Sequence, residues 1–261
     1  MYARIKTLIF HLAKLMGLFA LARRITRRGL RILCYHSFST DSDAAHRFRP
    51  GTFMRPQTFR RRIDVLARMK LPVLPLHDAL NRLRDGTLPP CAVAGKLGNR
   101  LGVPYDEIVG GRVFSIMTAD EIREAVRAGI DIQLHAHRHR LPDDPEAARR
   151  EIRENRAVLE PLVAQPPPAG NVAQAPPAGS VALLRHFCYP SGVWNAGHFA
   201  ALRDVGILSA TTCEAGLNYA HTPPLALRRF LDGEQVSDIE FEAELSGFSE
   251  LLRRVFRRQA S

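Results

Sequence analysis

Short apolar runs typical of strands alternate with segments of helical periodicity along most of this chain. Residues 30–35 (LRILCY) predict a strand, and Phe59, Ile63 and Leu66 recur at helical spacing within 57–69. Alternation of this kind is typical of α/β proteins, in which helices cover a sheet. At 261 residues, the chain is long enough for one such domain with a sizeable core.

The alternation continues toward the C-terminus with recognisable helix starts. Thr118 and Glu121 form a capping-box pattern that opens one helix, and Asp144 followed by Pro145 opens another. The remaining predicted strands are 73–76, 130–134, 185–189, 207–211 and 225–230, and 91–93 could begin one more. The remaining predicted helices are 77–84, 197–205 and an amphipathic segment over 242–258.

The chain is basic, with 37 Lys and Arg against 26 Asp and Glu and a net charge of +11. Much of the excess lies in two arginine clusters near the ends, at 23–28 and 253–258. Such clusters favour an anionic lipid surface, polysaccharide or nucleic acid, or are simply solvated helix faces. No recognisable nucleic-acid-binding module accompanies the charge, so we expect no nucleic-acid partner.

The N-terminal segment 8–22 is apolar but is interrupted by His11 and Lys14. It is too short and too broken for a membrane span, and it resembles a signal peptide in part. A basic amphipathic helix over 1–29 that lies on a membrane surface fits better, because the first strand follows at Leu30. The four widely spaced cysteines favour free thiols and a reducing compartment. We therefore expect a cytoplasmic or membrane-associated protein.

Residues 166–183 contain two nearly identical units, PPPAGNVAQ and APPAGSVAL. Two units are too few for a repeat architecture, and their Pro, Ala and Gly content predicts a surface loop. We expect an insertion without chemistry of its own.

Two histidines carry the clearest chemical pattern. His135 and His139 follow the predicted strand 130–134 at a spacing of four residues. On a helical turn this spacing places both imidazoles on one side, within reach of one divalent cation. A solvated loop rich in His and Arg is the alternative.

An ordered set of segments resembles the polysaccharide deacetylase (NodB-homology, carbohydrate esterase 4-like) family. The segments are Cys34-Tyr35-His36, His135 to His139, and 187–192 (FCYPSG), with a lead-in over 59–88. The resemblance covers most of residues 30–230. It implies a distorted (β/α) barrel and a metal-dependent hydrolase that removes acetyl groups from an acetylated polysaccharide or oligosaccharide.

The resemblance also implies roles for individual residues. His135 and His139 would be the two imidazole ligands of a divalent metal, expected to be zinc. The turn of Tyr189, Pro190, Ser191 and Gly192 would line the substrate groove. Trp194 suits either a groove wall or the edge of the core. His221 is the nearest candidate for the family's general acid.

One expected motif is missing. The family's Thr-Phe-Asp-Asp-Gly segment, which supplies the base and the third metal ligand, should follow Leu88, but 94–99 (AGKLGN) contains no carboxylate. The stretch from Leu88 to Thr118 is also short, so we predict an incomplete barrel that lacks one strand–helix unit. The expected zinc site is therefore weak or incomplete.

These observations predict a deacetylase-like domain over 30–240, preceded by the basic helix 1–29 and followed by a helix over 241–261. The function expected is hydrolysis of the acetamido C–N bond of a glycan. The alternative is a catalytically impaired relative that binds a glycan or a partner, because the acidic motif is absent.

Overall fold

The computed structural model describes residues 2–38, 53–94, 117–164 and 184–259. Its strands are β1 (Arg31–Cys34), β2 (Ser37–Phe38), β3 (Phe53–Met54), β4 (Val73–Leu74), β5 (Val93–Ala94), β6 (His186–Cys188), β7 (Ser209–Thr211) and β8 (Phe230–Leu231). Its α-helices are α1 (Tyr2–Leu15), α2 (Leu18–Ile25), α4 (Pro56–Arg68), α5 (Leu76–Asp85), α7 (Ala119–Arg127), α8 (Pro145–Val163), α9 (His198–Asp204), α10 (Asp238–Ser246) and α11 (Phe248–Gln259).

The strands are short and parallel. Four of them form one sheet in the order β4-β5-β1-β8, and β6 pairs with β7. The segment 227–231 connects the two groups, because Leu227 bridges to Thr211 of β7 while Phe230 and Leu231 pair with β1. Leu134 extends the pair β6 and β7 on the β6 side through a parallel bridge to Phe187. The α/β prediction is confirmed.

The predicted barrel is not confirmed. The series of paired strands begins at β4 and ends at Leu134. Among the described residues no pairing joins these two ends, so the strands do not close into a barrel there. The predicted strand over 91–93 is present as β5, directly before residues 95–116, which lie outside the described residues. The predicted loop insertion at 166–183 also lies outside them.

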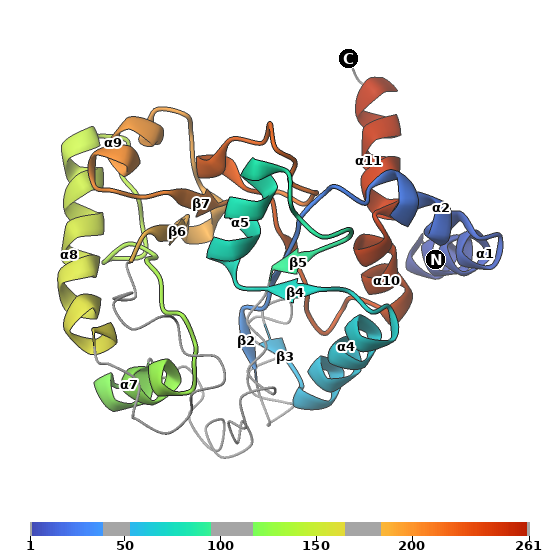
Figure 1. The fold of residues 1–261 in the computed structure, drawn as a ribbon, viewed down its shortest axis with the longest axis horizontal. Coiled ribbons are helices and arrows are strands. Elements are labelled where there is room, and N and C mark those ends of the chain that lie inside the picture. The colour runs from blue at the N-terminus through green and yellow to red at the C-terminus, as the bar shows by residue number, and fades with distance from the viewer. Residues whose placement is uncertain (1, 39–52, 95–116, 165–183, 260–261) are drawn as a thin grey trace.

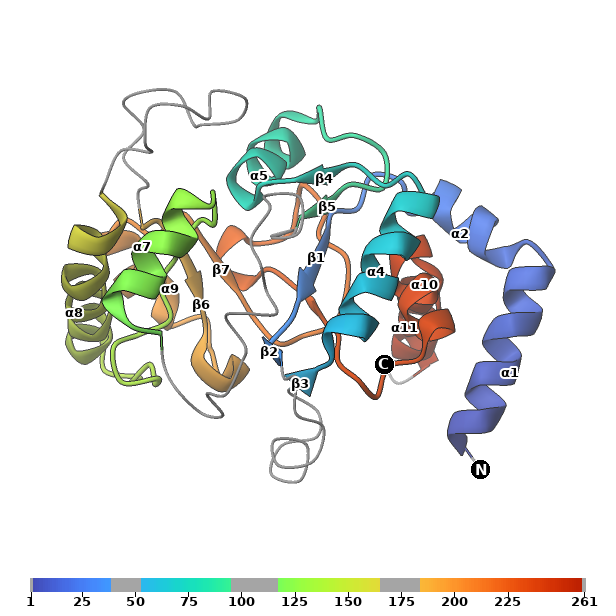
Figure 2. The same cartoon turned by 90° about the horizontal axis from the view of Figure 1, so that it is seen from below.

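The helices pack on both sides of the sheet (Figure 1). Around β6 and β7, a core forms from Leu134, Ile152 of α8, Phe187 and Leu202 of α9. On the other side, Val65 and Leu66 of α4 pack with Val93 and with Phe241 of α10. Figure 2 shows α1 and α2 beside α10 and α11, at the end of the molecule away from α8.

The predicted helix starts are confirmed. Thr118 accepts a hydrogen bond from the Glu121 amide, and the Glu121 carboxylate accepts one from the Thr118 amide. Asp144 caps α8 through the amide of Ala147. Each of these contacts spans three residues, which is why the local sequence is sufficient to predict them.

Four predicted elements differ from the structure. The single helix predicted over 1–29 is two helices, α1 and α2, because Gly17 between them adopts the left-handed conformation. Among the described residues, 130–134 pair with β6 only at the bridge of Leu134. Residues 224–226 form a 3-10 turn, so the last strand begins at Phe230. The single helix predicted over 242–258 is two helices, since Gly247 ends α10 in the left-handed conformation at φ 79°.

Candidate functional site

The candidate site lies where the strands β1, β6 and β7 end. Leu134 hydrogen bonds with β6 through the carbonyl of His186 at 3.1 Å and the amide of Cys188 at 3.0 Å. His135 therefore stands beside the last residue of β6. The C-terminal edge of parallel strands is the usual place for ligands in α/β folds.

The structure brings His135 and His139 together. Their ring centroids are 4.8 Å apart, with an interplanar angle of 81°. The helical turn expected between them is absent, because Ala136 (φ 63°) and His139 (φ 54°) adopt left-handed backbone conformations that turn the chain back on itself. A tight loop, rather than a helix, produces the proximity of the two rings.

The ring of His135 has a fixed orientation. Its Nδ1 lies 2.6 Å from the carbonyl oxygen of Cys188, which accepts only, so Nδ1 carries the proton. In the neutral imidazole, Nε2 then keeps a free lone pair. Histidines that bind metals commonly donate their other ring N–H to a carbonyl in this way.

Helix α8 holds the histidine loop in place. Asn155 Oδ1 accepts from the His135 amide at 3.0 Å, and Glu151 accepts from the amide and the guanidinium of Arg138 at 2.8 and 2.7 Å. Glu154 contacts the same guanidinium. Two successive turns of one helix thus fix the backbone between the two imidazoles.

Arg229 gathers three thiols at the same edge of the sheet. Its Nη1 is 3.0 Å from Cys188 Sγ and its Nη2 is 3.2 Å from Cys213 Sγ. Burial raises the pKa of the Cys34 thiol to about 11, against the opposing effect of Arg229. Burial would also raise the pKa of Cys188, but His135 and Arg229 outweigh it, and that pKa is lowered. No local sequence pattern indicates this cluster, because the cysteines are far apart in the chain.

The predicted groove segment is mostly structural. Tyr189 is completely buried and donates its hydroxyl to the carbonyl of Leu225 at 2.9 Å, and Pro190 is buried as well. Neither side chain is accessible, so a substrate could meet these two residues only through their backbone. That the turn lines a substrate groove stays a prediction. Ser191 is exposed, and Gly192 has φ 70°, where a Cβ would lie 2.5 Å from that of Cys213.

Trp194 lies half-buried at the edge of the core. It stacks on Phe199 with ring centroids 5.7 Å apart and donates from Nε1 to Glu214 at 3.2 Å. Of the two roles left open by the sequence, the packing at the edge of the core is the one observed.

His221 lies away from the histidine pair. It stacks on Tyr219 at 5.7 Å, and the neighbouring Asn218 pairs with Leu30, just before β1 begins. The pair His135 and His139 is instead at the other end of the strands. The structure therefore does not bring His221 together with the residues it was predicted to assist.

The two imidazoles suit a divalent metal, but they do not complete a site by themselves. Across residues 2–38, 53–94, 117–164 and 184–259, no three His, Cys, Asp or Glu side chains are grouped to hold an ion. A catalytic zinc normally has three protein ligands. The nearest acidic residues after β5 in the sequence, Asp106 and Glu107, lie outside the described residues.

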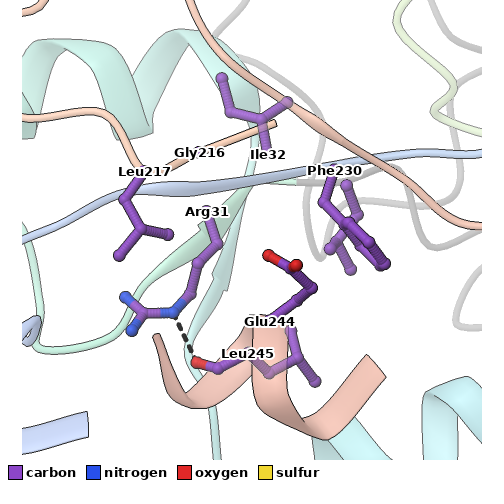
Figure 3. A pocket seen from close by; sticks show the side chains of 8 residues that line it. Arg31, Ile32, Gly216, Leu217, Phe230, Glu244 and Leu245 are labelled. Carbon is purple, nitrogen blue, oxygen red and sulfur yellow. Dashed lines mark hydrogen bonds between the residues drawn. The ribbon is translucent and has the colours of Figure 1, made fainter. Parts of the chain in front are cut away.

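A small cavity lies elsewhere, between the start of β1 and α10 (Figure 3). Arg31, Leu217, Phe230 and Glu244 are among the residues that line it, and its volume of about 10 Å³ suits roughly one water molecule. Arg31 Nε donates to the carbonyl of Leu245 at 2.6 Å. This cavity is too small for a sugar and is separate from the histidine pair.

Comparisons with known proteins identify the fold. The sequence matches no protein-family model and no curated protein. Among solved structures it is similar to the Streptococcus pyogenes deacetylase PplD in complex with acetate, with 16% identity, a TM-score of 0.62, and coverage of 83% of this chain and 98% of that one. It is also similar to IcaB from Ammonifex degensii, with 16% identity, a TM-score of 0.60, and coverage of 84% and 97%. A de-N-acetylase from Aggregatibacter actinomycetemcomitans has 12% identity and a TM-score of 0.54, with coverage of 83% and 99%. The chain thus has the fold of polysaccharide deacetylases.

Proposed function

From this shared fold, we propose that the protein is a glycan deacetylase-like hydrolase that acts on acetamido C–N bonds of an acetylated polysaccharide or oligosaccharide. The observation that carries the proposal is the contact between the rings of His135 and His139 at the C-terminal edge of the sheet. The expected cofactor is a divalent metal, zinc first, with these two imidazoles among its ligands.

The chain's own residues would prepare this site. The carbonyl of Cys188 keeps the proton of His135 on Nδ1 and directs Nε2 away from β6. Asn155 and Glu151 hold the loop so that His139 stays against His135. When bound, a metal at this position would supply Lewis acidity toward an acetyl carbonyl. Exposed Ser191 lies on the segment after β6, where a sugar could reach it.

A second candidate function is glycan or partner binding without efficient catalysis. It is favoured by the sequence after β5, where 94–99 lacks the two aspartates of the family motif. Loss of a general base lowers rates on the order of 10²–10⁴-fold. Such a protein would keep the groove and its ligand without rapid turnover.

Metal content tests the proposal first. We expect the untagged protein to bind zinc, and the double variant His135→Ala/His139→Ala to lose on the order of 100-fold in affinity, because both imidazoles are removed. The matched control is His11→Ala/His221→Ala, which removes two exposed histidines away from the pair. Zinc is measured by dialysis and elemental analysis.

The outcomes separate the two functions. Zinc that is lost only in the His135/His139 variant, together with acetate release from an N-acetylglucosamine oligosaccharide, supports the hydrolase. Little zinc in all three proteins, with oligosaccharide binding but no acetate release, supports the binding protein. Near-stoichiometric zinc retained equally by all three proteins would contradict a metal role for the histidine pair.

A further inference from the structure

The outer side of α1 and α2 is unusually apolar for a solvent-facing surface. Eight of the fifteen exposed large hydrophobic side chains in the described part of the chain lie between residues 5 and 25. They are Ile5, Leu8, Ile9, Leu12, Leu15, Met16, Leu21 and Ile25, here called the N-terminal apolar face. On α1 they recur every three or four residues and therefore share one side of the helix.

Two lysines of α1 pair with acidic residues of the protein while remaining nearly half exposed. Lys6 forms a salt bridge with Glu240 at 2.7 Å, and Lys14 pairs with Glu242, both on α10. Leu15, by contrast, is 87% exposed. An isolated water-soluble helix is expected to present mainly polar groups to the solvent, whereas α1 presents a row of large apolar side chains.

The opposite side of the two helices is already packed. Phe10 and Phe19 are buried against each other and against Phe248, with Ile239 and Ala243 of α10 in the same cluster. Figure 2 places α1 at the outer edge of the molecule, with α10 and α11 on its inner side. The exposed apolar side is therefore a surface of the folded protein.

The geometry suits a bilayer surface rather than a crossing. Within the described residues, no single helix is long and apolar enough to span a membrane. The pair passes that test only together, and it is bent by 78° at the break before α2. Gly17 (φ 76°) makes this bend, so both helices can lie along one surface.

Charge complementarity identifies the kind of surface. Arg24, Arg27 and Arg28 are exposed and follow the apolar residues of α2 directly. Basic side chains beside an apolar helix face are attracted to anionic headgroups while the apolar side chains enter the acyl boundary. We propose that the N-terminal apolar face docks the folded protein on a phospholipid bilayer that contains anionic lipid.

Vesicle flotation of the full chain tests this docking. The protein should float with vesicles of phosphatidylcholine and phosphatidylglycerol (7:3), and less with phosphatidylcholine alone, with binding weakened by salt. The variant Leu8→Glu/Leu12→Glu/Leu15→Glu should lose on the order of 100-fold in partitioning, because three apolar contacts become charges. Arg24→Glu/Arg27→Glu/Arg28→Glu should lose binding only to the anionic vesicles.

The matched control is Val158→Glu/Val193→Glu, which adds charge at two exposed apolar residues on the other side of the molecule. Circular dichroism and thermal unfolding confirm that each variant is folded, and the single substitution Leu15→Glu serves if the triple variant is not. Failure of the wild-type protein to bind the anionic vesicles would overturn the proposal. Equal binding of the apolar-face variants and of the control to these vesicles would also overturn it. A third contrary result is a dimer in sedimentation that the Leu substitutions dissociate, in a protein that binds no vesicles.

Discussion

Replacing Arg62 with alanine is expected to lower the free energy of unfolding by about 3–5 kcal/mol. Arg62 and Asp232 are both fully buried side chains, with Nε 2.9 Å from Oδ2. The guanidinium also donates to the carbonyl of Val236 at 2.5 Å and lies over the ring of Phe241 at 4.7 Å. Without Arg62, the carboxyl of Asp232 would remain in the core with no opposite charge.

The pair as a whole contributes less than this loss suggests. Burial raises the pKa of Asp232, and the attraction of Arg62 does not fully offset that effect. Desolvation therefore cancels much of the gain from the ion pair. We expect the double variant Arg62→Met/Asp232→Leu to be more stable than Arg62→Ala, because it leaves no buried charge unpaired.

Urea unfolding followed by circular dichroism measures these differences. Arg61→Ala is the matched control, since Arg61 is half exposed and its contact with Asp238 is 3.7 Å; its cost should stay below about 1 kcal/mol. A cost for Arg62→Ala no larger than that of Arg61→Ala would contradict the argument. A double variant less stable than Arg62→Ala would also contradict it.

Replacing Gly247 with alanine is expected to cost about 2–5 kcal/mol. Gly247 separates α10 from α11 at φ 79°, where an L-residue costs roughly 1–2 kcal/mol. The added Cβ would also lie 2.1 Å from Oγ1 and 2.8 Å from Cβ of Thr26 at the end of α2. Relief of such an overlap within a packed region costs a further 1–3 kcal/mol, roughly.

Gly86 provides an almost ideal control for this substitution. It ends α5 at the same φ of 79°, but a Cβ added there would meet no atom within 4 Å. Gly86→Ala should therefore show the backbone cost alone, and the difference between the two variants measures the overlap with Thr26. Equal costs in urea unfolding would show that the region around Thr26 shifts freely.

Local sequence predicted the helices better than the strands. The caps at Thr118 and Asp144 act through neighbours three residues away, so they can be recognised without the fold. The strands depend on partners that are far away in the chain. Residues 130–134 have alternating character, but within the described part of the chain only Leu134 of this stretch pairs with a strand.

Backbone conformation explains the other differences. The apolar periodicity of 242–258 continues through Gly247, so this periodicity predicted one helix. The left-handed conformation of Gly247 divides the segment into α10 and α11. At the site, the sequence pointed to His135 and His139 but suggested a helical turn. The left-handed conformation of Ala136 depends on packing against α8, which the spacing of two histidines does not encode.

Most of the site's supporting contacts were beyond local sequence patterns. Cys188 lies 53 residues after His135, and Arg229 lies 41 residues after Cys188. Neither residue belongs to a pattern that would associate it with the other. Only the order of strands at the sheet edge reveals that they meet.

The central position of β1 has a consequence for synthesis on the ribosome. This strand emerges early, yet one of its two neighbours is β8, and Arg31 hydrogen bonds to Leu245, 214 residues later. At bacterial or eukaryotic elongation rates of 5–20 residues per second, that interval lasts roughly 10–40 s. For this time β1 has no β8 to pair with, so this edge of the strand is completed only near the end of synthesis.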